Sequence, residues 1–76
     1  MANNLNGWSA SEVVKFLKAH GFSLHRTNGS HFHYKKQTAE YAYLVTVAYH
    51  SNRSIPIGTM QSIVRQSGIA REIWKK

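Results

Sequence analysis

The sequence contains no cysteine and no aspartate, and its only carboxylate side chains belong to Glu12, Glu40 and Glu72. The absence of cysteine excludes disulfides, a thiol nucleophile and any zinc site with cysteine ligands. Without aspartate, a Ser-His-Asp triad would need a glutamate in its place. A magnesium-dependent nuclease needs carboxylates that converge on the metal, and scattered glutamates hardly supply them. The composition therefore favours chemistry that uses neither a metal nor a thiol.

Long apolar runs are missing as well. No stretch approaches the ~20 residues that a membrane span needs, and nothing near Met1 resembles a secretion signal. Together with the lack of cysteine, this predicts a soluble cytoplasmic protein with no membrane partner. A chain of 76 residues supports only one core, so we expect a single domain over residues 1–76.

The charge is strongly positive. Ten lysines and arginines stand against three acidic residues and give a net charge of +7 at pH 7. This balance favours a polyanionic partner, first of all a nucleic acid, although anionic lipids and acidic proteins also bind small basic domains.

The hydrophobic spacing predicts two helices around three strands. Ser9 to Glu12 has the Ser-x-x-Glu form of a capping box, and Gly21 predicts the end of that helix near His20. A second helical pattern begins at Met60 and ends at Gly68. A last turn after it carries Ile73 and Trp74. Alternating apolar and polar residues predict strands at 22–25, 31–35 and 43–50.

These elements predict an α+β fold of the order α-β-β-β-α. The strands would form a three-stranded antiparallel meander, with both helices on one face so that most apolar residues are buried.

The hairpin between the first two strands has two candidate loops. A two-residue loop at Asn28-Gly29 would place core and polar residues together on each face of the sheet. A three-residue loop at Thr27–Gly29, with Gly29 left-handed, pairs Leu24 with Phe32 and creates one apolar face. We therefore expect the three-residue loop.

The three-residue loop also predicts where the histidines lie. It places His25 opposite His31 on the face away from the helices, with His33 and Lys35 further along that face. The histidines would thus cluster on the solvent side of the sheet.

The residues alone leave four interpretations of this cluster open. The histidines are simply exposed strand residues, or His31 and His33, ~7 Å apart, bind a metal with His25 as the obvious third candidate. In the third interpretation the surface binds RNA or DNA without cleaving it. Its phosphate contacts would be Arg26, Lys35, Lys36 and Arg53.

The fourth interpretation is cleavage of RNA by acid-base catalysis. This reaction needs a proton acceptor for the 2′-hydroxyl, a proton donor for the 5′ leaving oxygen and positive charge around the phosphorane. Histidine ordinarily titrates near pH 6.5 and can perform either proton transfer without a metal.

The pair Gly58-Thr59 at the start of the second helix also has two interpretations. Small and hydroxyl residues suit a first helical turn and need no further role. Alternatively, the free backbone N–H groups of that turn hold a substrate phosphate, as helix N-termini readily do.

Three segments, "AHGFSLHRTNGSHFHY", "VTVAYH" and "IGTMQSIVRQSGI", resemble the HicA family of small bacterial toxins in order and spacing. The resemblance covers about residues 9–74 and leaves residues 1–8 as an N-terminal extension. It implies a fold like that of the double-stranded-RNA-binding domain, cleavage of messenger RNA and inhibition by the antitoxin HicB. The essential histidine of the family lies in Gly-Ser-His, which here is His31.

The resemblance and the residues together predict a metal-independent endoribonuclease, an mRNA interferase toxin of a bacterial toxin-antitoxin pair, which needs no cofactor. His31 would be the catalytic residue, and a HicB-type antitoxin would cover its face. The alternative is an RNA-binding module without activity. The predicted RNA contacts are Arg26, Gly29, Ser30, His33, Lys35, Lys36, Gly58 and Thr59. The pattern also includes His50, to which it assigns no role.

Overall fold

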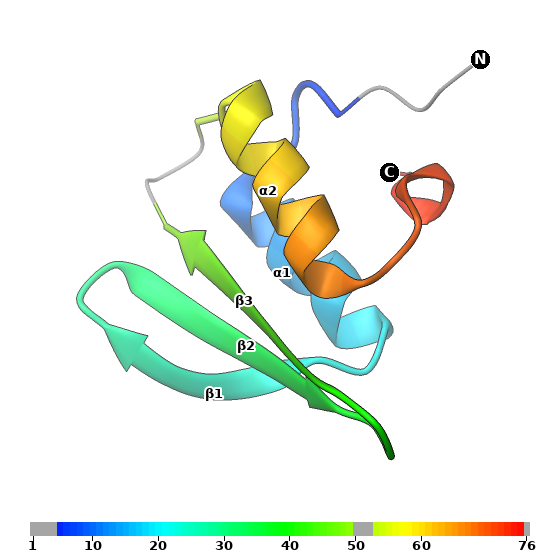
Figure 1. The fold of residues 1–76 in the computed structure, drawn as a ribbon. Coiled ribbons are helices and arrows are strands. Elements are labelled where there is room, and N and C mark those ends of the chain that lie inside the picture. Colours follow the sequence, from blue (N-terminus) through cyan, green and yellow to red (C-terminus); the bar gives the residue numbers. More distant parts are fainter. Residues whose placement is uncertain (1–4, 50–52, 76) are drawn as a thin grey trace.

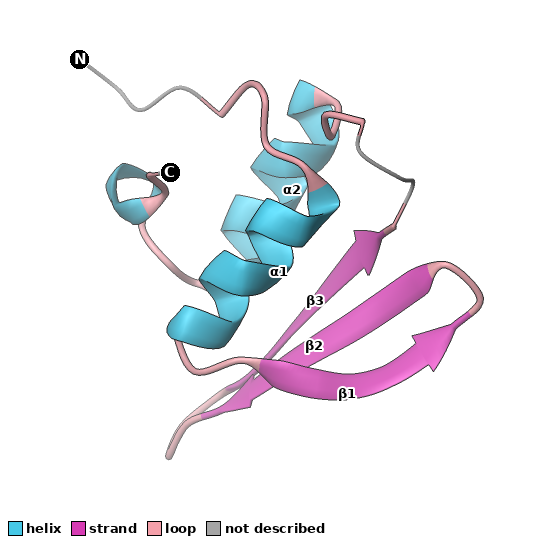
Figure 2. Ribbon diagram, turned by 180° about the vertical axis from the view of Figure 1, so that it is seen from behind, coloured by secondary structure: helices cyan, strands magenta, loops and turns pink. Residues whose placement is uncertain are grey.

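The computed structural model describes residues 5–49 and 53–75. Its elements are α1 (Ala10–Ala19), β1 (Ser23–Asn28), β2 (His31–Gln37), β3 (Ala42–Ala48), α2 (Ile57–Ser67) and the short 3-10 helix η1 (Arg71–Ile73) (Figure 1). The strands form one antiparallel sheet in the order β1-β2-β3. Both helices lie on the same side of the sheet, as Figure 2 shows from behind. The predicted α+β fold is confirmed.

Helix α1 begins at the predicted capping box. The Ser9 N–H donates to Glu12 Oε1 at 2.9 Å, and the Glu12 N–H donates to Ser9 Oγ at 3.2 Å. The helix ends with His20 as its C-cap, followed by Gly21 at a φ of 92°. Neither helix of the described chain is long and apolar enough to cross a membrane.

The hairpin between β1 and β2 differs from both predicted loops. Asn28 pairs with His31, so the loop consists of the two residues Gly29 and Ser30. Gly29 has a φ of 62°, a left-handed conformation that glycine adopts readily in tight hairpin turns. The left-handed Gly29 is confirmed, but the three-residue loop is wrong, and His25 does not pair with His31.

An irregularity in β1 explains how the sheet keeps one apolar face. The register shifts between Leu24 and Arg26 and leaves His25 as an extra residue in β1. Leu24 thereby pairs with Tyr34. Without the extra residue Leu24 would lie opposite Lys35 on the polar face, because a shift of one residue turns a side chain to the other side. The bulge, and not a longer loop, therefore produces the single apolar face.

The helices do not cover strand β1. All six of its residues are exposed, including Leu24 at 48%. The helices pack against β3, at the opposite edge of the sheet. The apolar face of the sheet is therefore covered over β2 and β3 and open at β1.

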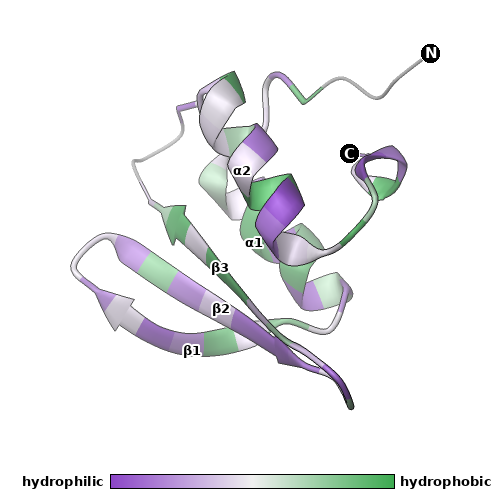
Figure 3. Ribbon diagram, viewed as in Figure 1, coloured by the Kyte–Doolittle hydropathy of each residue, from purple (hydrophilic) through white to green (hydrophobic). Residues whose placement is uncertain are grey.

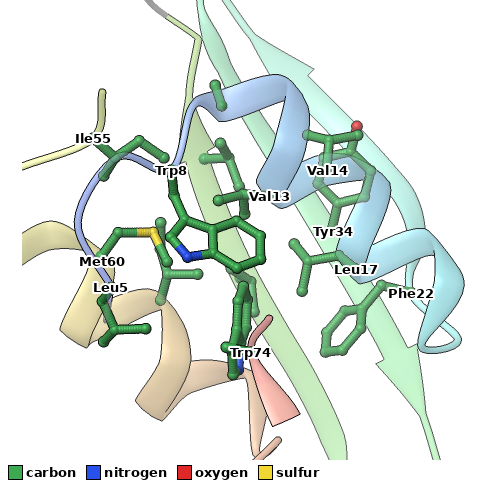
Figure 4. Packing of buried hydrophobic residues seen from close by; sticks show 14 residues of the cluster. Leu5, Trp8, Val13, Val14, Leu17, Phe22, Tyr34, Ile55, Met60 and Trp74 are labelled. Atoms are coloured by element: carbon green, nitrogen blue, oxygen red, sulfur yellow. The ribbon is translucent and has the colours of Figure 1, made fainter. Parts of the chain in front are cut away.

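The core between the helices and the sheet includes residues before α1 and after α2 (Figure 4). Leu5, Trp8 and Trp74 are each at most 2% exposed. The Trp74 ring stacks on Phe16 with 4.0 Å between centroids, and Trp8 meets Trp74 edge-on at 5.4 Å. The described part of the N-terminal extension is thus part of the core, while residues 1–4 lie outside the described residues.

Gly68 is the C-cap of α2 and lies against the Tyr43 ring of β3, which leads to a prediction about stability. It has a φ of 71°, and a methyl group there would collide with the Tyr43 ring, whose Cζ lies 2.9 Å from the methyl position. We expect Gly68→Ala to lower the free energy of unfolding by about 2–4 kcal/mol, because a left-handed alanine costs ~1–2 kcal/mol and the collision adds to it. Chemical denaturation measures this loss.

Gly29→Ala is the matched control. Gly29 also has a positive φ, 62°, but no atom lies within 4 Å of its methyl position. This variant should lose only the backbone contribution of ~1–2 kcal/mol. Equal losses in the two variants would show that the Tyr43 ring moves aside without cost.

Candidate active site

The face of the sheet turned away from the helices carries polar side chains from β2. Tyr34 is buried beneath the helices at 4% exposure, and alternate side chains of a strand point to opposite faces. His31, His33 and Lys35 therefore share the outer face, and Figure 3 shows the alternation of hydrophilic and hydrophobic residues along β2. This confirms that His31 lies on the face opposite Tyr34.

The register places partners from both neighbouring strands beside these residues. Across the sheet, the three rows are Asn28–His31–Ala48, Arg26–His33–Thr46 and Ser23–Lys35–Leu44. The second row places the predicted Arg26 opposite His33, one row away from His31. The outer face thus combines imidazole rings with cationic side chains.

His31 stands at the end of the face nearest the turn. It is exposed and directly follows Gly29 and Ser30. The turn is tied to the end of β3, because the Tyr49 N–H donates to the Ser30 carbonyl oxygen at 2.8 Å. An ordered backbone therefore presents a solvent-accessible ring, which suits a group that must meet a flexible substrate.

His33 is held more closely than His31. Its Nδ1 lies 2.8 Å from the Thr46 hydroxyl oxygen, and its side chain is half-buried. Because this hydrogen bond occupies Nδ1, Nε2 is the nitrogen left for a ligand. Either partner can be the donor, depending on the tautomer of the ring.

Lys36 lies apart from this face. Its Nζ is 5.9 Å from the centroid of the Phe22 ring, and Phe22 belongs to the core. The structure therefore does not bring Lys36 together with His31, whereas Lys35 shares the face with it.

Gly58 and Thr59 lie in the first turn of α2, whose N-cap Pro56 forms no side-chain cap. Thr59 borders a pocket that extends to Arg53 and to Ala48, the register partner of His31. The start of α2 is therefore near the end of β3.

Two further features concern metals and ionisation. Among residues 5–49 and 53–75, no three histidine or glutamate side chains gather as metal ligands would. Burial, together with the nearby Tyr49, raises the pKa of Tyr34 above its ordinary value of 10.0. Tyr34 thus remains a neutral core residue at physiological pH.

His50 lies outside the described residues.

Thr46 and Leu44 also lie on the candidate face, although no sequence motif marks either residue. The alternation along 43–50 does place even-numbered residues on one side of the strand. Only the β2–β3 register shows that Thr46 lies opposite His33 and Leu44 opposite Lys35. Leu44 is 51% exposed.

A comparison with known protein families identifies the family of the chain. The family model described as HicA toxin of bacterial toxin-antitoxin matches residues 10–69, a range that spans both α-helices and all three strands. Searches among curated proteins and among solved structures give no match. Because the family model covers most of the chain, this protein belongs to the HicA family of toxins from bacterial toxin-antitoxin systems.

Proposed function

We propose that this toxin is a metal-independent endoribonuclease, an mRNA interferase, in which His31 carries the acid-base chemistry. The observation that supports this most is the exposed His31 ring on an ordered turn, within a face that also carries His33, Arg26 and Lys35. The family membership adds that the protein is a toxin.

The reaction needs only groups that this face supplies. A base removes the proton of the 2′-hydroxyl, the 2′-oxygen forms a bond to phosphorus, and the bond from phosphorus to the 5′-oxygen breaks as an acid protonates it. The products are a 2′,3′-cyclic phosphate and a 5′-hydroxyl. Cations near the phosphate stabilise the negative charge of the transition state.

The RNA contacts divide between this face and the helix start. Arg26 and Lys35 would bind phosphates beside the histidines, and Gly29 and Ser30 would let the RNA approach the backbone of the turn. The N–H groups of Gly58 and Thr59 would hold a further phosphate at the uncapped start of α2.

The inhibitory partner would be a HicB-type antitoxin that covers the same face. A net charge of +7 favours an acidic partner surface. Leu44, half-exposed and opposite Lys35, would supply an apolar anchor in such an interface.

An RNA-binding module without activity is the alternative, and a cleavage assay separates the two. Mixed RNA is incubated with the protein, with and without EDTA, and with the His31→Ala variant. We expect cleavage that survives EDTA and disappears in His31→Ala. Complete inhibition by EDTA that magnesium reverses would overturn the metal-independent mechanism, and retained cleavage by His31→Ala would overturn the role of His31.

Lys35 and Lys36 offer a matched test of the RNA-binding face. They are neighbours of equal charge on opposite faces of β2. We expect Lys35→Ala to weaken RNA binding and to reduce the slope of log K against log salt by roughly 0.7, the change for one phosphate contact on a single strand. Lys36→Ala should leave that slope unchanged.

The measurement is the affinity for a single-stranded RNA at several salt concentrations, with an inactive His31→Ala background so that the RNA stays intact. A reduced slope in Lys36→Ala but not in Lys35→Ala would place the RNA on the helix side of the sheet.

A further inference from the structure

A side-chain hydrogen bond joins His33 of β2 to Thr46 of β3, in addition to the backbone pairing of the two strands. It lies on the exposed face, one row from His31. We infer that His33 is the proton donor to the leaving 5′-oxygen, with Thr46 as its positioning residue, and that His31 is the proton acceptor. This inference rests on the proposed ribonuclease activity and assigns its two proton transfers.

The hydrogen bond defines which nitrogen of His33 meets the RNA. Thr46 Oγ1 occupies Nδ1 at 2.8 Å and limits rotation of the half-buried ring. Nε2 is then the reactive nitrogen. Thr46 itself reaches only the far side of the imidazole, so it acts through His33 and not on the substrate.

A threonine hydroxyl suits a ring that must lose a proton. In the imidazolium, Nδ1–H donates to Thr46 and Nε2–H is available to the leaving oxygen. After Nε2 gives up its proton, the neutral ring keeps Nδ1–H, and its bond to Thr46 does not change. The contact therefore fits the ring before and after the transfer, without reorganisation in the transition state.

The spacing of the two histidines suits an in-line displacement. His31 and His33 are two residues apart on one face of β2, which corresponds to ~7 Å along a strand. The 2′-oxygen enters and the 5′-oxygen leaves on opposite sides of the phosphorus, so the acceptor and the donor must approach from two sides. Rings at this separation can lie on either side of one phosphate, and Arg26, opposite His33, would offset the negative charge of that phosphate.

The proton balance is complete. The 2′-hydroxyl proton passes to His31 as the 2′-oxygen bonds to phosphorus, and His33 gives its Nε2 proton to the 5′-oxygen as that bond breaks. Exchange with water then returns each ring to its starting state. The role of His33 thus differs from simple phosphate binding, which transfers no proton.

A pair of substrates tests the donor role. One is an ordinary dinucleotide, and the other has sulfur in place of the bridging 5′-oxygen, because a thiolate leaves without prior protonation. We expect His33→Ala to reduce cleavage of the ordinary dinucleotide by ~10² to 10⁴ and cleavage of the sulfur substrate by less than about tenfold. His31→Ala should reduce cleavage of both substrates alike.

Two variants of Thr46 test its positioning role. Thr46→Val keeps the branched shape of the side chain and removes the hydroxyl, whereas Thr46→Ser keeps the hydroxyl. We expect Thr46→Val to reduce cleavage by roughly 10- to 100-fold through a misplaced ring, and Thr46→Ser to retain most of it. ¹⁵N NMR of the imidazole rings should show altered His33 signals in Thr46→Val and unaltered His31 signals.

The outcomes separate this inference from the proposed function. Equal losses by His33→Ala on the two substrates, or no loss on either, would overturn the donor role and leave the ribonuclease activity standing. Unaltered His33 ring signals in Thr46→Val would overturn the positioning role. A wild-type protein that cleaves neither substrate would overturn the proposed function, and the donor role with it.

Discussion

Replacement of His31 by alanine is expected to reduce RNA cleavage by ~10² to 10⁴, the usual contribution of one acid-base group. Growth inhibition in bacteria should disappear with it. The ring is exposed and no described residue hydrogen-bonds to it, so the free energy of unfolding should change by no more than ~0.5 kcal/mol. Cleavage rate, thermal midpoint and growth together measure these effects.

His25→Ala is the matched control for this variant. It makes the same side-chain change at an exposed position of β1, at the bulge and outside the His31 row. We expect His25→Ala to cleave RNA at nearly the wild-type rate. A large loss of activity in both variants would indicate that the charge of the face matters, and not the proton transfer at His31.

Antitoxin affinity provides the third observation on His31→Ala. If a HicB-type antitoxin covers the face through a broad interface with few anchors, one missing imidazole should change its affinity only slightly. A collapse of the thermal midpoint together with loss of cleavage would show that His31 is structural, and its catalytic role would then have to be abandoned.

Replacement of Trp74 by alanine is expected to lower the free energy of unfolding by ~3–5 kcal/mol, the range for buried aromatic residues. Trp74 is 1% exposed, stacks on Phe16 and meets Trp8 edge-on. Small domains have only ~5–15 kcal/mol of stability in total, so this single change should remove a large part of it and lower the thermal midpoint. Urea denaturation at low temperature measures the loss.

Two further variants, at positions 73 and 74, test whether the buried aromatic ring of Trp74 accounts for this loss of stability. Ile73 is 50% exposed, so Ile73→Ala should change stability by only about 0.5 kcal/mol. The Trp74 Nε1 is buried without a hydrogen-bond partner, so Trp74→Phe keeps an aromatic ring and loses no hydrogen bond; it should cost less than Trp74→Ala. Similar losses in Trp74→Phe and Trp74→Ala would show that the size of the indole matters more than ring stacking.

Much of the fold and part of the site follow from local patterns. The capping box at Ser9 and Glu12 marks the start of α1, because its hydrogen bonds join residues three apart in the chain. The alternation along β2 assigns His31, His33 and Lys35 to one face, since that period belongs to any strand. The same alternation places Lys36, one of the predicted RNA contacts, on the opposite face.

Other features depend on contacts between distant residues, and local patterns do not contain them. The bulge at His25 arises because Leu24 and Tyr34 must share a face once the turn has formed at Gly29 and Ser30. Trp8 and Trp74 meet only after the two ends of the chain pack on α1. Thr46 reaches His33 through the register of β2 against β3, thirteen residues apart in sequence. Local sequence patterns therefore identify His31 as an exposed strand residue. Only the tertiary structure shows the hydrogen bond between His33 and Thr46, because it depends on how β2 and β3 pair.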